Sequence, residues 1–498
     1  MLLKFLYMLI HILVAHNVSF ATFILPYAGL DHGGSAFFIT FLPSVTPIPD
    51  VHVKLFITTP ERVPVTFTIS APGMGYFDRA TVDPGEAKEF TFRAEDYALS
   101  NTTDRFKGII IMAENEKQIF VYGAEDMTYA TDSFLALPLH DLGGESYTYI
   151  AAMIHTLDNS TFYGNYEEIH SLIGIISAEM DTLLTITPTQ DVTIGTESVE
   201  AGETVLVTLH RAETLLIPCL GDLTGTKVTS NRPISFLCGD QCPYIPSGVP
   251  YCDQIVEQLP PVEAWGRQFA TAPLKTRKSF DVFRIVAAKS NTIVSISCVM
   301  QNGTQGYVDT LTLSKGGSVD VQVNSREFCW MQADTNVLLL QFAVGITADS
   351  VPSDPFMAVV PAVSHYTNFL TLPIVNSTFN DFTHYLNIII PAEHYQPDQT
   401  FLDGQSLQSL ALEFAAIVHN GETMAYATQL EVSATTHTLI HDNSTGVIGV
   451  TAYGFAYRAS YGHVGGIRIP QFSEFVHACV SYIYGGSRNI TDHHTLGQ

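Results

Sequence analysis

The chain is patterned as many short apolar segments, and long helical periodicity is missing from it. The segments are rich in β-branched and aromatic residues and end at Gly, Pro, Asn or Asp, which is typical of strands joined by turns. We therefore predict an all-β fold whose strands include 52–57, 65–69, 108–113, 119–123, 183–186, 205–209, 293–296 and 337–342. The best helix candidates are 407–418 and 473–482, and neither has strong capping residues.

The order of these segments repeats along the chain. A similar opening strand recurs at 37–43, 149–154, 269–274, 369–374 and 466–472, about 100 to 120 residues apart. Late in most repeats an Asp precedes an apolar step that ends in proline, as in DSFLALP, DQIVEQLPP and DPFMAVVP. The pattern predicts four related β units at roughly 35–147, 148–268, 269–368 and 369–472.

Two arrangements of the four units fit this pattern. One is a tandem array of β-sandwich-like units, and the other is a propeller-like closed array in which the last opening strand completes the first unit. The sequence does not separate them. No Pro-, Ser- or Gly-rich linker divides the units, so we expect them to pack on each other without flexible linkers.

Composition narrows the classes of function. The 498 residues are 46% hydrophobic and 14% charged, which favours a large folded core over disorder. The formal charge of −26 opposes binding to phosphate backbones, so nucleic acid is not expected as a partner. No later stretch is long and apolar enough for a membrane span.

The N-terminus predicts export. Lys4 precedes an apolar run over 5–15, and small residues follow at Ser19 and Ala21, which is typical of a signal peptide over 1–21. An N-terminal anchor is the alternative interpretation. Sequons predict N-glycosylation of a secreted, extracellular protein at Asn101, Asn159, Asn302, Asn376, Asn443 and Asn489. The polar tail 485–498 is expected to be mobile.

Six of the seven cysteines are expected to form disulfides in an oxidising compartment. Cys242 and Cys252 flank a proline-rich loop, and closing so small a loop contributes about 2 to 3 kcal/mol by chain entropy. Cys298 with Cys329, and Cys219 with Cys238, are the next expected pairs, although six cysteines allow other connectivities. Cys479 remains, either buried in an apolar run or bridging to another chain.

No motif of an enzyme, a cofactor site or a metal site is apparent. A nucleophile elbow, a His-Glu-x-x-His pair and a phosphate-binding glycine loop are missing. GDLTGT at 221–226 lacks a following helix and is interpreted as a turn between strands. Cys238 and Cys242 lack further ligands at zinc-binding spacing. We therefore predict no catalytic residues, no cofactor and no metal, although carboxylates brought together by folding would allow a glycosidase.

Four aromatic residues are candidates for packing or recognition. Trp265 and Trp330 are expected to pack in the core. Tyr244 and Tyr251 lie in or beside the cysteine-bounded loop, where rigid aromatics on a constrained loop suit protein contacts. The alternative for both tyrosines is that they pack back against the sheet.

The segments ALPLHDLGGESY, GDLTGTKVTSNRP and CDQIVEQLPPVEAWG resemble the N-terminal domain of IgGFc-binding proteins, and the resemblance covers 35–472. It supports the bridge between Cys242 and Cys252, and it implies an extracellular, non-catalytic, glycosylated binding domain. The expected function is adhesion to another glycoprotein, with immunoglobulin Fc and mucin as candidate ligands. The alternatives are an extracellular glycan-acting hydrolase on a β scaffold and a structural coat or matrix component. The oligomeric state stays open.

Overall fold

The computed structural model describes residues 30–45, 51–139, 146–156, 169–249, 251–443 and 445–469. The fold is nearly all β, as the alternating pattern predicted, with nine antiparallel sheets in these residues. The helices within these described residues are single turns, namely α2 (Ala94–Tyr97), α3 (Ile346–Asp349), η1 (Pro72–Met74), η2 (Glu114–Glu116), η3 (Val262–Ala264), η4 (Val363–His365) and η5 (Ala392–His394). The predicted signal segment 1–21, the helix candidate 473–482, Cys479 and the tail 485–498 lie outside the described residues.

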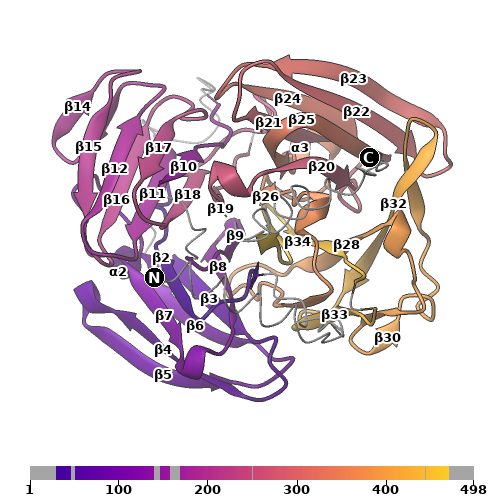
Figure 1. Ribbon diagram of the computed structural model, residues 1–498, viewed down its shortest axis with the longest axis horizontal. Helices are drawn as coiled ribbons and strands as arrows, with labels where there is room; N and C mark the ends of the chain where they lie inside the picture. Colours follow the sequence, from indigo (N-terminus) through magenta and orange to yellow (C-terminus); the bar gives the residue numbers. More distant parts are fainter. Residues whose placement is uncertain are drawn as a thin grey trace, which may run out of the picture.

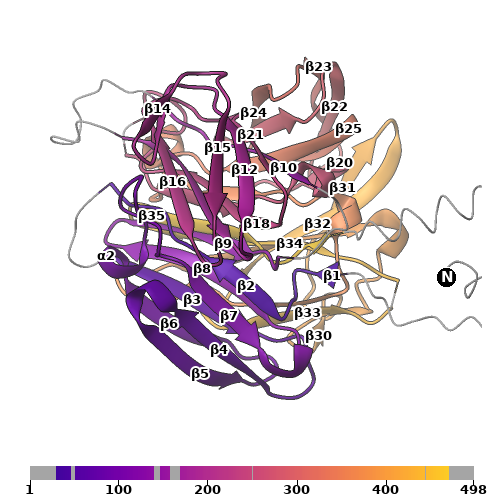
Figure 2. The ribbon, with the colours of Figure 1, turned by 60° about the vertical axis from the view of Figure 1, so that its left-hand side comes forward.

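All but one of the sheets fall into four chain segments, here called units 1 to 4. Unit 1 has an outer sheet of β2 (Ala36–Ile39), β7 (Ile109–Ala113), β4 (Val65–Ala71) and β5 (Tyr76–Val82). Its inner sheet is β6 (Lys88–Arg93), β3 (His52–Thr58), β8 (Phe120–Met127) and β9 (Ala130–Ala136). Figure 2 shows these two sheets as stacked layers.

Unit 2 has the same strand order. Its outer sheet is β10 (Tyr147–Ile150), β17 (Lys227–Ser230), β12 (Thr182–Thr187) and β15 (Val205–Leu209). Its inner sheet is β16 (Thr214–Cys219), β11 (Ser171–Ser177), β18 (Ile234–Asp240) and β19 (Ile255–Gln258). A small hairpin is added by β13 (Val192–Ile194) and β14 (Glu197–Val199).

In unit 3 one long strand, β25 (Glu327–Phe342), belongs to both layers. Its first half pairs with β20 (Gly266–Thr271) and β22 (Thr292–Met300), and β22 pairs with β23 (Gln305–Leu313). Its second half pairs with β21 (Phe280–Ala287) and β26 (Met357–Val359), and β21 pairs with β24 (Ser318–Asn324). The strand order of units 1 and 2 is therefore kept while the two sheets are joined.

Unit 4 completes the set. Its outer sheet is β27 (Phe369–Leu372), β33 (His437–His441), β29 (Thr400–Leu402) and β30 (Gln405–Ser406). Its inner sheet is β31 (Ala415–His419), β32 (Glu422–Val432), β28 (Thr383–Pro391), β34 (Gly449–Ala456) and β35 (Ala459–Val464). The remaining pair, β1 (Leu30–Asp31) with β36 (Arg468–Ile469), joins the two ends of the described chain.

Figure 1 shows the four units arranged around a middle occupied by β8, β9, β19, β26 and β34. Each unit keeps its own sheets, and β36 pairs with β1 instead of extending a sheet of unit 1, so no closed barrel or propeller forms among the described residues. The predicted unit boundaries at 148 and 269 differ slightly from the strands, because β10 begins at Tyr147 and β20 at Gly266.

Burial follows the position of each strand in the layers. In β4 and β12 buried positions alternate with partly or fully exposed ones, as expected for strands with one face toward the core. In β8, β11 and β18 every residue is buried, because one face of the inner sheet packs on the outer sheet and the other packs on neighbouring units. The largest apolar cluster includes Phe120, Phe236, Leu340 and Leu386, one residue from each unit, so the core is continuous.

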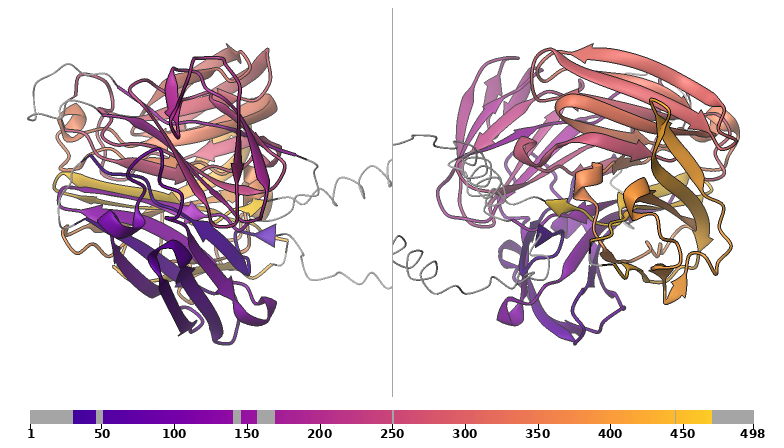
Figure 3. Two further views of the ribbon diagram at one scale, coloured as in Figure 1. Left: turned by 90° about the vertical axis from the view of Figure 1, so that its left-hand side faces the viewer. Right: turned by 45° about the vertical axis from the view of Figure 1, so that its right-hand side comes forward.

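The helix predicted over 407–418 is wrong. Leu407 is fully buried after the short strand β30, and turns follow it until β31 begins at Ala415. In β31, Ala415 and Ile417 point into an apolar cluster that also holds Trp330 of unit 3. Tertiary packing against unit 3, visible in the right panel of Figure 3, therefore outweighs the local helical spacing of Leu407, Leu410 and Leu412.

The closing strands of the units meet in the middle of the molecule. Strand β9 contacts β19 and β35, and β26 contacts the same two strands, so the four strands form a ring of neighbours. They are the last strands of their inner sheets, and no backbone pairing joins one to the next. Their free backbone N–H groups are buried here and need acceptors from side chains.

Asp132 on β9 supplies such acceptors to all three other units. Its carboxylate accepts hydrogen bonds from Val256 N at 2.9 Å, Met357 N at 3.3 Å and Gly462 N at 3.3 Å, which lie on β19, β26 and β35. Ser133 N adds a fourth, local bond at 2.8 Å. Burial raises the pKa of Asp132 well above its ordinary range, while these amide donors favour the ionised form.

The recurring Asp of the sequence repeat is explained by this arrangement. Asp253, the equivalent residue of unit 2, accepts from Thr131 N and Ser460 N. Glu257 on the same closing segment accepts from Val359 N at 2.9 Å. Asp354 of unit 3 is close enough to raise the pKa of Asp253 further, after the main effect of burial. The acidic positions therefore connect the units to each other.

We expect Asp132→Asn to destabilise the whole molecule. An amide replaces one carboxylate oxygen, so buried N–H donors from two or more units face a group that cannot accept from all of them, at a cost of about 1 to 3 kcal/mol for each. The free energy of unfolding from denaturant titration should fall by about 2 to 5 kcal/mol. Asp78→Asn is the control, because Asp78 is exposed and accepts a hydrogen bond from the neighbouring Arg79 N, within its own strand. Equal stability of the two variants would contradict the assignment.

We also expect the stability to fall as the pH rises from 5 to 8. Burial raises the pKa of Glu125 to about 8 and that of Asp354 to about 7, so the folded chain keeps protons that the unfolded chain has released. The stabilisation is complete at low pH and is lost as the pH passes these raised values. Urea titrations at several pH values should show a decrease of about 1 kcal/mol or more, and Glu125→Gln should make the slope shallower. A flat or rising profile would be inconsistent with this prediction.

Candidate functional site

The cysteine-bounded loop lies between β18 and β19, and it is bridged by Cys242 and Cys252 as predicted. Its first half packs inward. Tyr244 is only 5% exposed, and its backbone N–H donates to Thr156 Oγ1 at 2.7 Å. Ile245 O accepts from Gly345 N at 2.8 Å, which connects the loop to unit 3. Tyr244 was proposed as a contact residue, and its burial makes that prediction wrong.

Tyr251, the second predicted contact residue, is half-buried beneath an arginine of unit 4. The Arg458 guanidinium lies 4.3 Å from the centre of the Tyr251 ring and donates to Tyr251 Oη at 2.9 Å. The same guanidinium lies 5.3 Å from the centre of the Tyr457 ring. Tyr251 therefore serves as support for an arginine and a tyrosine that sequence reasoning did not select.

A third tyrosine, exposed like Tyr457, joins this group from unit 1. Tyr129 and Tyr457 meet edge to face with ring centres 6.4 Å apart, and they are 55% and 58% exposed. Tyr129 N lies 3.4 Å from Asn380 Oδ1, its acceptor in unit 4. Tyr129, Tyr251, Tyr457 and Arg458 are here called the tyrosine–arginine cluster.

The cluster forms because equivalent connections of the four units gather on one side of the molecule. Tyr129 lies in the β8–β9 turn, Arg458 in the β34–β35 turn, and Tyr251 in the β18–β19 loop. Tyr129 and Arg458 both have left-handed backbones, with φ of 64° and 59°, as tight hairpin turns require. The equivalence of these turns in the repeat was the sequence signal that would have found Tyr129 and Tyr457.

The electrostatics of the cluster depend on Arg458. Its positive charge lowers the pKa of buried Asp354, although burial is the larger effect and leaves that pKa at about 7. Exposed tyrosines around an arginine are the residue types that contribute most to binding at protein interfaces. The Tyr457 ring contacts both the Arg458 guanidinium and the edge-to-face ring of Tyr129. These contacts limit the conformational freedom that the rings would lose on binding, so the cluster is suited to recognition of another surface.

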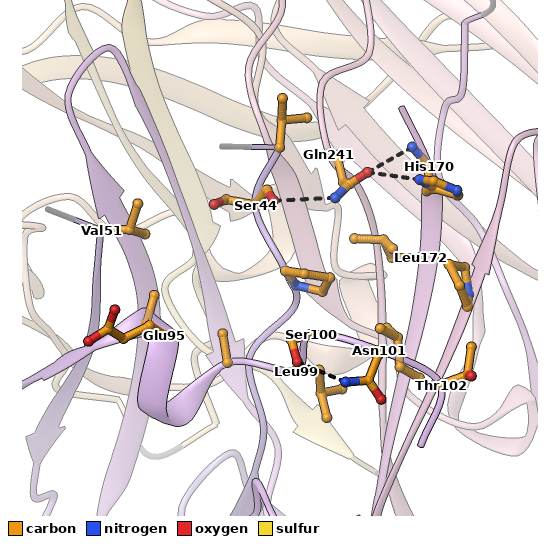
Figure 4. A pocket seen from close by; sticks show the side chains of 16 residues that line it. Ser44, Val51, Glu95, Leu99, Ser100, Asn101, Thr102, His170, Leu172 and Gln241 are labelled. Carbon is orange, nitrogen blue, oxygen red and sulfur yellow. Dashed lines mark hydrogen bonds between the residues drawn. The ribbon is translucent and has the colours of Figure 1, made fainter. Parts of the chain in front are cut away.

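A groove of about 840 Å³ lies between units 1 and 2. Figure 4 shows Gln241, the residue before Cys242, donating to Ser44 O at 3.3 Å and accepting from His170 N at 2.9 Å. Its walls are mostly apolar and its rim is polar, and the lining includes Pro43, Val51, Leu99, Asn101, Leu172, Leu216 and Pro218.

The remaining cysteine predictions have two outcomes. Cys298 and Cys329 are bonded, because they lie directly opposite each other on β22 and β25. The pair of Cys219 and Cys238 is wrong, since both are buried free thiols. They lie on β16 and β18, which flank β11, so two strand spacings of about 4.8 Å separate them, beyond the reach of a disulfide.

Four of the six predicted glycosylation sites lie in the described part of the chain. Asn101, Asn302 and Asn376 are exposed and Asn443 is half-buried, while Asn159 and Asn489 lie outside the described residues. In three of them the asparagine side chain accepts from the backbone N–H of the sequon threonine, at 2.9 Å for Thr103, 3.0 Å for Thr304 and 3.1 Å for Thr445. Their accessibility is compatible with modification, which stays a prediction.

The structure also places the other residues selected from the sequence. Trp265 and Trp330 are both buried, and Trp265 Nε1 donates to Pro260 O at 3.1 Å. GDLTGT forms the turn between β16 and β17, where Asp222 accepts from Arg284 of unit 3 at 2.6 Å. Across the parts of the chain that the structure describes, no group of three His, Cys, Asp or Glu side chains is placed to hold a metal ion. No helix there is long and apolar enough to cross a membrane.

Comparison with known proteins gives one family. The family described as IgGFc binding protein matches residues 132–454. The human "IgGFc-binding protein" is 22% identical over 313 residues, which are 63% of this chain and 5% of that protein, so the chain spans only a small part of its relative.

A solved structure, "tetra-tandem repeat in extending region of large adhesion protein", is 11% identical and covers 87% of this chain and 98% of its own, but its TM-score of 0.10 does not indicate a shared fold. The family match extends from Asp132 in unit 1 to Gly454 in unit 4, so it includes the cysteine-bounded loop and all of units 2 and 3. This chain belongs to the IgGFc-binding protein family.

Proposed function

We propose that this protein is a secreted, glycosylated and non-catalytic binding module that holds another extracellular glycoprotein through its tyrosine–arginine cluster. The observation that carries the proposal is the exposure of Tyr129 and Tyr457 around a cation held in place by stacking, in a member of a family of binding proteins. Neither ring is buried in the apolar core. Both tyrosines present more than half of their surface to solvent.

The construction of the cluster supports recognition by a preformed surface. Arg458 is held between two rings, and Tyr251 is held by a loop that a disulfide closes at its base. Little side-chain entropy remains to be lost on binding, which favours affinity from a small contact area.

Immunoglobulin Fc is the first partner to test, because the human relative is called an IgGFc-binding protein and this chain shares part of its length. Mucin is the second partner to test, because the family resemblance of the sequence also implies it as a ligand. Export is supported by two disulfides and by sequons on exposed turns, since both are typical of extracellular proteins.

We expect purified protein to bind immobilised Fc or mucin saturably in a biosensor, and Tyr129→Ala with Tyr457→Ala to weaken that binding at least tenfold. Both rings are largely exposed, so the thermal midpoint should change little. Phe77→Ala is the matched control, because Phe77 is 69% exposed on the peripheral strand β5 and should leave binding unchanged.

Three results separate the parts of this proposal. Wild-type affinity in the double variant would exclude the tyrosine–arginine cluster as the contact surface. Binding to mucin and not to Fc would exclude immunoglobulin as the partner while keeping the module. Saturable binding to neither would contradict the proposed function.

A further inference from the structure

The groove between units 1 and 2 has a sequon on its rim. Asn101 lines the groove together with its neighbours Leu99, Ser100 and Thr102. Figure 4 shows the Asn101 amide beside Ser100, and its nitrogen donates to Ser100 Oγ at 3.1 Å. The side chain is exposed, so the amide nitrogen that would carry a sugar is at the mouth of the cavity.

The Asn101 side chain is held in a fixed direction. Its Oδ1 accepts from Thr103 N at 2.9 Å and from Thr103 Oγ1 at 2.6 Å, which closes a local turn. Thr102 Oγ1 donates to Gly195 O at 2.7 Å and so attaches the same turn to unit 2. A group linked to Asn101 would therefore begin from a defined position between the two units.

The walls of the groove match the chemistry of an N-acetylglucosamine core. Pro43, Val45 and Pro218 are half-buried and supply apolar surface, on which the C–H faces of pyranose rings and the methyl of an acetamido group pack. Gln241 lies at the opposite rim with its hydrogen-bonding atoms near Ser44 and His170. The volume of about 840 Å³ lies within the usual range for small-ligand sites, roughly 300 to 1,000 Å³.

We infer that the groove binds the N-linked glycan of Asn101. The inner sugar residues of this glycan cover the apolar walls of the groove and bridge units 1 and 2. The sugar is attached by an ordinary N-glycosidic bond to the Asn101 amide, formed during export. The inference therefore rests on the proposed secretion, and it adds a structural role for one particular glycan. The other exposed sequons differ, because neither Asn302 nor Asn376 lines this groove.

Two matched variants isolate the effect of this glycan. Thr103→Ala removes the sequon of Asn101 but leaves the bond from the backbone N–H of residue 103. Thr304→Ala does the same at Asn302, whose turn carries the equivalent bond at 3.0 Å and joins β22 to β23. Thr103→Ser keeps the sequon and should behave as the wild-type protein. All are produced as the full chain in eukaryotic cells that glycosylate.

Mass spectrometry should find Asn101 occupied in the wild-type protein and in Thr103→Ser. Binding of the fluorescent apolar dye ANS should rise severalfold in Thr103→Ala and stay unchanged in Thr304→Ala, since only the first variant uncovers the groove. An endoglycosidase acting on the folded wild-type protein should release the Asn302 glycan several times faster than the Asn101 glycan. Asn101→Gln provides a second variant, with circular dichroism to confirm its folding.

An unoccupied Asn101 beside an occupied Asn302 would overturn this inference and leave secretion supported. Occupancy at neither site would contradict the export on which both proposals depend. Equal dye binding by Thr103→Ala and Thr304→Ala, or equal release of the two glycans, would show that the Asn101 sugar extends into solvent and that the groove has no glycan.

Discussion

The architecture depends on three hydrogen bonds that the Asp132 carboxylate accepts from backbone N–H groups of the other units. Each unit ends in an unpaired strand edge, and the four edges meet where water is excluded. Buried amides without acceptors would make such a centre unstable. One short acidic side chain converts four sheet edges into a junction, so that the units fold as a single body with a continuous core.

The same junction decides where the tyrosine–arginine cluster lies. Because the closing strands converge, the connections that lead into them also converge, and three of these connections supply Tyr129, Tyr251 and Arg458. Residues more than 300 positions apart in sequence, such as Tyr129 and Tyr457, are thereby placed in contact. A ring of related units can build a composite surface from loops that are individually small and simple.

Sequence reasoning predicted what depends on local pattern. Alternation along 65–69 and 183–186 located strands correctly, and the positions of Cys298 and Cys329 in two strand-like runs of one unit indicated a bridge between them. It failed where long-range packing decides the outcome. Strand β11 inserts between Cys219 and Cys238, Trp330 of unit 3 packs on the segment expected as a helix, and the side on which Tyr244 lies depends on a loop folded against unit 3.

The pairing of β1 with β36 also determines how the protein responds to mechanical load. Leu30 is opposite Ile469 and Asp31 is opposite Arg468, in antiparallel register, so tension between the two ends pulls directly across this pair. The bonds then open one after another, which needs less force than shearing a long strand from a sheet. Under tension the two-residue pair of β1 and β36 therefore separates first, before force reaches the Asp132 hydrogen bonds and the four units.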